Sequence, residues 1–169
     1  MRMWISFCVL VVLALLERQS THAGFTWREP LCRSIPLVGF GDTLHYWNRY
    51  GNSCYVYIYH TLEYQYAQRY CNKLNASIVE INDEKENADV SRYVQIMSDE
   101  HNDTWIGINR LSKHVWVFGT DRTPLTFYKW DDYEPNVCGS CVVFRKTDKW
   151  FVQVCEQSKT FVCEQPYVE

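Results

Sequence analysis

The segment from Cys54 to Tyr59 alternates between two kinds of side chain, three tyrosines on one side and a valine and an isoleucine on the other. A period of two among aromatic and β-branched residues is typical of a β-strand. We therefore predict a strand here, with the tyrosines facing one way and the aliphatic residues facing the other.

Two helices are predicted after this strand. Apolar positions recur at helical spacing from Leu62 to Leu74, and Thr61 is the expected N-cap. A short apolar strand over Ser77–Ile81 follows. Asn82 is then expected to cap a second helix, whose acidic first turn complements the helix dipole and which ends before His101.

The second half of the chain has a different pattern. From Trp105 onward, short apolar runs are separated by turn residues, with one turn over Gly119–Pro124 and a longer loop over Asp131–Ser140. Two helices followed by short strands predict an α+β domain.

The N-terminal segment is predicted to direct secretion. Arg2 precedes an apolar run from Trp4 to Leu16, and small residues end at Ala23. This run is shorter than the roughly 20 residues of a membrane-spanning helix, so we interpret residues 1–23 as a signal peptide of an extracellular protein. Residues 24–45 are expected to form an irregular extension tied down by Cys32, and residues 46–165 the folded domain.

The net charge and the absence of enzyme motifs exclude several classes of function. The chain has 17 Lys and Arg residues against 20 Asp and Glu residues, a formal net charge of −3, and no basic stripe. Neither nucleic acid nor an anionic membrane is therefore an expected partner. The sequence also lacks Gly-x-Ser-x-Gly, His-Glu-x-x-His and a phosphate-binding glycine loop, so we do not expect an enzyme.

The cysteines indicate disulfides. Removal of a signal peptide would take Cys8 with it and leave seven cysteines. An odd number leaves one thiol that is free or paired between chains. Zinc is the other interpretation of Cys138 and Cys141, but a structural zinc site usually needs a second close pair of ligands, and none is present.

An ordered set of motifs in the second half carries a family resemblance. Trp105-Ile106-Gly107 is followed by Trp116, Trp130, Glu134-Pro135-Asn136, Trp150 and Phe161-Val162-Cys163-Glu164. This order resembles the C-type lectin-like domain, from about Tyr46 to Glu164. The resemblance implies two helices packed on short antiparallel sheets, a long loop region, disulfide bridges and a binding function.

The resemblance also implies which cysteines pair. The expected bridges are Cys71–Cys163, Cys141–Cys155 and Cys32–Cys54. Cys138 is then left over, as a free thiol, an alternative partner for Cys32 or Cys155, or an interchain bridge.

The sugar-binding chemistry of the family is only partly retained. Its sugar-binding members hold calcium with five side chains, and calcium takes 6–8 oxygen ligands. Glu134 and Asn136 are kept, but the other three positions hold Gly139, Phe151 and Val152. We therefore expect no calcium, no other metal and no cofactor.

Several other residues are assigned from their positions. Tyr133 and Phe151 are expected to join Glu134 and Asn136 in contacting a ligand, whereas Asp131 and Asp132 are interpreted as exposed acids. The tryptophans expected in the core are Trp105, Trp116, Trp130 and Trp150. Two sequons are candidate glycosylation sites, at Asn75 and Asn102.

Two functions remain open. The first is glycan recognition at the Glu134 loop, weak or independent of calcium. The alternative is a protein-binding subunit of a disulfide-linked homo- or heterodimer, joined through Cys138 and acting on a receptor or a pathogen surface. The resemblance implies an immune setting, which the residues themselves do not indicate.

Overall fold

A computed structural model describes residues 32, 47–98, 103–136, 138–145 and 147–167. The chain divides into two compact units, Met1–Pro30 and Leu31–Glu169, and every described residue belongs to the second. The expected signal peptide and the 24–45 extension, apart from Cys32, lie outside this part. Within it, no helix is long and apolar enough to cross a membrane.

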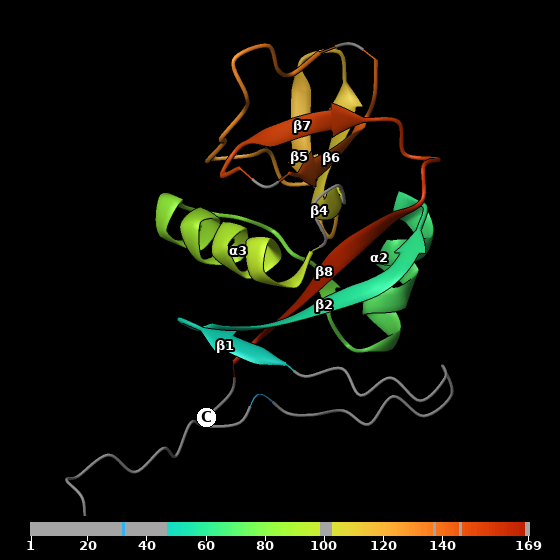
Figure 1. The fold of residues 1–169 in the computed structure, drawn as a ribbon. Helices are drawn as coiled ribbons and strands as arrows, with labels where there is room; N and C mark the ends of the chain where they lie inside the picture. The colour runs from blue at the N-terminus through green and yellow to red at the C-terminus, as the bar shows by residue number, and fades with distance from the viewer. Residues whose placement is uncertain (1–31, 33–46, 99–102, 137, 146, 168–169) are drawn as a thin grey trace, which may run out of the picture. The chain divides into compact units, whose positions relative to one another are not determined.

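Eight strands form one connected sheet in the order β1-β2-β8-β4-β6-β7, with β3 on β8 and β5 on β4 (Figure 1). The strands are β1 (Asn48–Tyr50), β2 (Ser53–Leu62), β3 (Ser77–Ile78), β4 (Thr104–Ser112), β5 (Val115–Phe118), β6 (Cys141–Phe144), β7 (Trp150–Gln153) and β8 (Lys159–Pro166). All pairings are antiparallel except β4 with β8, which is parallel. The α+β prediction is confirmed, although the strands join into a single sheet.

The two helices pack on opposite faces of this sheet (Figure 1). Helices α2 (Tyr64–Lys73) and α3 (Glu84–Met97) are the two predicted from the sequence. The alternation in β2 explains their placement, because Tyr55 and Tyr57 join the core cluster under α3, whereas Val56 and Ile58 join the cluster under α2. From Cys54 to Ile58 the strand is thus buried on both faces, whereas Tyr59 is exposed.

Both predicted helix caps were wrong by one or two residues. Thr61 belongs to β2, which continues to Leu62, and the N-cap of α2 is Glu63, whose side chain makes no capping bond. For α3 the cap is Asp83, whose carboxylate accepts the Glu86 N–H at 2.8 Å. Glu86 Oε2 in turn accepts the Asn82 N–H at 2.8 Å. Asp83 caps the helix in place of Asn82 because a carboxylate at the helix start also interacts favourably with the helix dipole.

Three disulfides staple the domain, and they join the pairs implied by the resemblance. They are Cys71–Cys163, between α2 and β8, Cys141–Cys155, between β6 and the segment after β7, and Cys32–Cys54, which reaches β2. Cys138 is exposed and is the free cysteine of the described residues.

Glu164 on β8 is a partly buried carboxyl group next to other acids. Its Oε2 accepts the Glu80 N–H at 3.1 Å. Burial, together with the nearby Glu86 and Glu80 carboxylates, raises the pKa of Glu164 to about 7. Burial acts this way because it penalises the charged form of a carboxyl group.

This raised pKa predicts a pH-dependent stability. Between pH about 4.5 and 7, the folded state keeps the Glu164 proton that the unfolded state has lost, so the free energy of unfolding decreases as pH rises, by up to about 3 kcal/mol. Glu164→Gln is expected to flatten this slope in denaturant titrations and to stabilise the protein at pH 7.5, whereas the exposed control Glu156→Gln is not. A Glu164→Gln protein with the wild-type slope would contradict this assignment.

Candidate functional site

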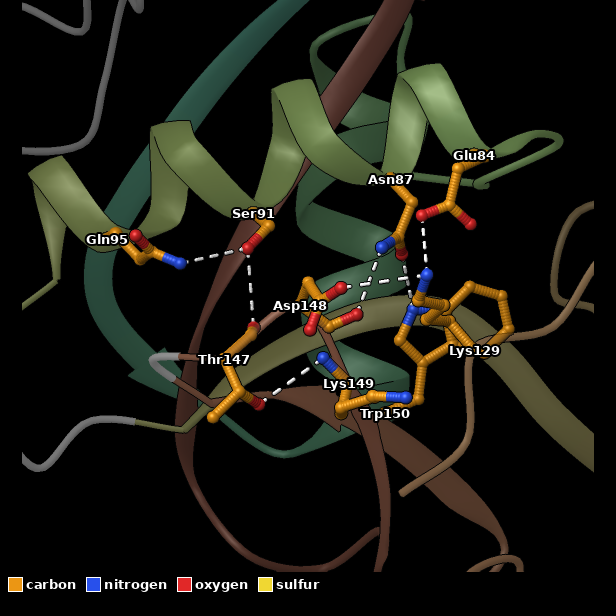
Figure 2. Close-up of polar contacts among 9 residues, drawn as sticks. All are labelled: Glu84, Asn87, Ser91, Gln95, Lys129, Thr147, Asp148, Lys149 and Trp150. Atoms are coloured by element: carbon orange, nitrogen blue, oxygen red, sulfur yellow. Dashed lines mark hydrogen bonds and ion pairs between the residues drawn. The ribbon is translucent and has the colours of Figure 1, made fainter. Parts of the chain in front are cut away.

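The β6–β7 turn and the start of β7, which lie beside the start of the long loop, are held to α3 by polar contacts (Figure 2). Trp150 Nε1 donates to Asn87 Oδ1 at 2.8 Å, and Asn87 Nδ2 donates to the Asp148 carbonyl at 2.9 Å. One turn along α3, Ser91 Oγ donates to the Thr147 carbonyl at 3.3 Å. Since Asn87 and Trp150 are fully buried, these bonds position the β6–β7 turn against the helix.

The start of the loop is attached to the same helix. Lys129 Nζ pairs with the carboxylates of Glu84 and Asp148 (Figure 2). The Trp150 N–H donates to the Lys129 carbonyl at 2.8 Å, and the Asp131 N–H donates to the Trp150 carbonyl at 3.1 Å. These backbone bonds align residues 129–131 alongside β7 and bring the following loop residues to the end of the sheet.

Three tryptophan rings pack against one another next to these contacts. The Trp130 ring lies edge-on to Trp150, with centroids 5.6 Å apart, and 4.9 Å from the Trp116 ring. Trp105 and Trp150 are fully buried, as predicted. Trp116 and Trp130 are only partly buried, however, because a cleft opens above them.

This cleft has a volume of about 440 Å³ and lies between the β4–β5 turn and the long loop. Lys113 and His114 contribute from the turn, Tyr128 from the segment before the loop, and Pro135 and Asn136 from the loop itself. We refer to it below as the loop cleft. Tyr128 is 66% exposed, so much of its ring faces solvent.

The lining of the loop cleft is basic and aromatic. Arg110 joins Lys113 and His114, and among the described residues that line it none has a carboxylate side chain. The Arg110 guanidinium lies 5.6 Å from the Trp116 ring centroid, a cation–π contact, and donates to Ser140 Oγ at 3.4 Å. Lys113 and His114 are exposed at the turn.

The Glu134-Pro135-Asn136 segment, with a cis bond before the proline, folds onto itself. The backbone N–H of Asn136 donates to Glu134 Oε2 at 2.7 Å, and Asn136 Nδ2 donates to Glu134 Oε1 at 2.8 Å. Asn136 Oδ1 accepts the Cys138 N–H at 2.9 Å. Each side-chain oxygen of the two residues therefore already accepts a hydrogen bond within the loop.

Comparison with known proteins identifies the family. Residues 60–165, more than half of the chain, match the Lectin C-type domain family. The chain belongs to the C-type lectin family.

Relatives and solved structures agree with this family. CD209 antigen-like protein A of Mus musculus is 30% identical over 142 residues, covering 81% of this chain and 54% of that protein. The chain thus spans about half the length of this mouse relative. Human lithostathine superposes with a TM-score of 0.68 at 19% identity, covering 88% of this chain and 99% of that one.

A solved carbohydrate-recognition domain shares this fold. The mouse scavenger receptor C-type lectin carbohydrate-recognition domain superposes with a TM-score of 0.66 at 18% identity, covering 73% of this chain and 95% of that one. C-type lectins are binding modules and not enzymes. This chain therefore holds a C-type lectin-like domain.

The calcium site of sugar-binding C-type lectins does not fit these residues. Phe151 and Val152 supply no side-chain oxygen where the family places two ligands. At Gly139, an added Cβ would lie 2.3 Å from the Gln153 carbonyl oxygen, so an acidic side chain is excluded by the backbone of β7. Within the described residues, no group of three His, Cys, Asp or Glu side chains is arranged to hold a metal ion.

The remaining candidate residues are scattered. Tyr133 is 92% exposed next to Glu134, but Phe151 packs against the core cluster under α2 and lies 4.2 Å from the Arg145 guanidinium. Phe151 is not among the residues of the loop cleft. Asn75 is exposed in a left-handed turn directly after α2, and Asn102 lies outside the described residues.

Sequence reasoning missed the basic side of the loop cleft. Arg110 lies near the end of β4, and Lys113 and His114 form the turn before β5. The one available signal was the polar Lys113-His114 pair between two apolar runs, which indicates a hairpin turn. Nothing local connected that turn with Tyr128 or Asn136.

Proposed function

We propose that this C-type lectin recognises glycan in the loop cleft without calcium at the Glu134 loop. The observation that carries this proposal is the closed Glu134–Asn136 pair, in which Asn136 donates two hydrogen bonds to the Glu134 carboxylate. This pair lies beside a cleft lined by Pro135 and Asn136. A cation at the loop would compete with hydrogen bonds that both side chains already make. It would also lack the oxygen ligands that calcium needs.

We further propose that the protein is secreted and glycosylated, with no enzymatic activity. Three disulfides in one small domain are typical of proteins that fold in an oxidising compartment. The signal peptide expected over residues 1–23 from the sequence supports the same route. Asn75 is the preferred glycosylation site, since its exposed turn is accessible to modification.

Calcium is expected to leave the melting temperature unchanged. For a site of micromolar affinity, millimolar calcium would stabilise the protein by about 4 kcal/mol. Thermal melts with calcium and with a chelator measure this difference directly. A stabilisation of that size, present in the wild type and absent in Glu134→Ala, would contradict the proposal that the Glu134 loop binds no calcium.

A glycan array run with and without chelator tests recognition itself. We expect binding to at least one glycan class that persists in the chelator and is weakened by Tyr128→Ala. The exposed Tyr66→Ala variant on α2 is the matched control, because it removes a tyrosine far from the lining of the loop cleft. An array without any bound glycan would refute carbohydrate recognition.

A second candidate function is protein recognition by a disulfide-linked dimer. The exposed, unpaired Cys138 favours it, because a free thiol on a secreted protein readily forms an interchain bridge. On a non-reducing gel the protein would then migrate at twice its monomer mass, and Cys138→Ser would migrate as monomer. A wild-type monomer whose Cys138 reacts readily with a thiol label would refute the dimer.

A further inference from the structure

We propose that the ligand of the loop cleft is an anionic saccharide, one whose sugar rings carry carboxylate or sulfate groups. This inference rests on the proposed glycan recognition and specifies its chemistry. It is carried by the basic and aromatic side chains that two separate segments bring together around the same cleft.

The first observation is the sign of the charge. The chain as a whole has a net charge of −3, yet the cationic side chains at the loop cleft are Arg110 and Lys113, and its described lining has no acidic side chain. A local basic surface on an acidic protein attracts anions by complementarity, mainly through the rate of association and the specificity of binding.

The second observation concerns the carboxylate of Glu134, next to the lining in the sequence. Glu134 directly precedes the lining residues Pro135 and Asn136, but both of its carboxylate oxygens accept hydrogen bonds from Asn136. Asn136 thus directs its N–H groups toward Glu134. An anion in the loop cleft would therefore meet less repulsion from this carboxylate than from an unpaired one.

The third observation is the aromatic surface beside the cations. Tyr128 is 66% exposed, and Trp116 and Trp130 are partly buried under the cleft with their rings 4.9 Å apart. A cleft with apolar walls and a few polar groups suits a ligand that has both a ring face and charged substituents. A sugar ring packs on the aromatic faces while its carboxylate or sulfate reaches the cations. A free inorganic anion would contact the cations but would have no ring to pack on the aromatic faces.

Lys113 in the β4–β5 turn and Tyr128 before the long loop provide the test variants. Lys113 is exposed, so Lys113→Gln removes the charge without creating a buried defect. Lys73→Gln at the exposed end of α2 is the charge-matched control. Tyr128→Phe keeps the ring face and Tyr128→Ala removes it, which separates stacking from the hydroxyl group.

The experiment is calorimetric titration of the full chain with a heparin octasaccharide and with a neutral maltooctaose, at low and high salt. We expect the octasaccharide to bind in chelator and to weaken at high salt, because exposed charges are screened. Lys113→Gln is expected to weaken it about threefold, and Lys113→Gln with Tyr128→Ala about tenfold or more. Lys73→Gln should bind like the wild type, and Tyr128→Phe should bind more tightly than Tyr128→Ala.

Different failures point to different parts of the hypothesis. If neutral glycans bind and the octasaccharide does not, or if Lys113→Gln binds the octasaccharide unchanged, the anionic assignment is overturned and glycan recognition stands. If no saccharide binds but a sulfotyrosine peptide does, both the anionic saccharide and glycan recognition are overturned in favour of protein recognition.

Discussion

Replacing Cys71 and Cys163 together by alanine is expected to lower the free energy of unfolding by about 4–5 kcal/mol. The bridge joins residues 92 positions apart and closes the longest loop of the three disulfides, so it restricts the unfolded chain most. Both cysteines are fully buried between α2 and β8. Chemical denaturation of the purified variant measures the loss.

The matched control is the Cys141→Ala, Cys155→Ala variant. Its bridge spans 14 positions, and the same chain-entropy model gives about 3 kcal/mol. The order of the two losses is therefore the expected result. A Cys71 and Cys163 variant that loses less stability than the control would show that loop closure does not dominate here.

The Asn87→Leu variant is expected to lose about 2–5 kcal/mol of stability, because it leaves one buried polar group without a partner and removes a second, part-buried hydrogen bond. The two groups are Trp150 Nε1–H and the Asp148 carbonyl, which contact the two ends of the Asn87 amide (Figure 2). Leucine has the branched shape of asparagine without its polar atoms, so the loss reports chiefly the missing hydrogen bonds. Denaturant titration measures it.

The Asn87→Leu variant also tests whether the contacts between α3 and Trp150 affect glycan binding. Because Trp150 supports Trp130 and aligns residues 129–131, Asn87→Leu is also expected to weaken glycan binding to the protein that remains folded. Gln95→Ala is the control, since this exposed residue of α3 contacts only the Ser91 hydroxyl in the same network. Equal stability of the two variants would contradict the role of Asn87.

The features predicted well from the sequence are those that depend on local periodicity. The alternation in β2 indicated two differently packed faces, and the two faces pack under different helices. The apolar spacing of α2 and α3 likewise reflects which side of each helix meets the sheet. The family motifs added the disulfide pairing, which spacing alone leaves open.

The positions predicted poorly were those decided by competition between neighbouring groups. Thr61 has the right chemistry for a cap, but pairing with β8 keeps β2 extended through Leu62. Phe151 neighbours Trp150 in sequence, yet successive residues of a strand point to opposite faces, so its ring packs under the other core cluster.

The sequence by itself determined the family, the α+β fold and the loss of three calcium-ligand positions, because each of these depends on residue identity at ordered positions. Only the tertiary structure decided where a ligand has room to bind. The loop cleft joins the Lys113–His114 turn to Tyr128 and Asn136, and no local pattern connects these segments. The closed Glu134–Asn136 pair and the lack of space at Gly139 could not be predicted from the sequence either, because they depend on distances in the folded chain.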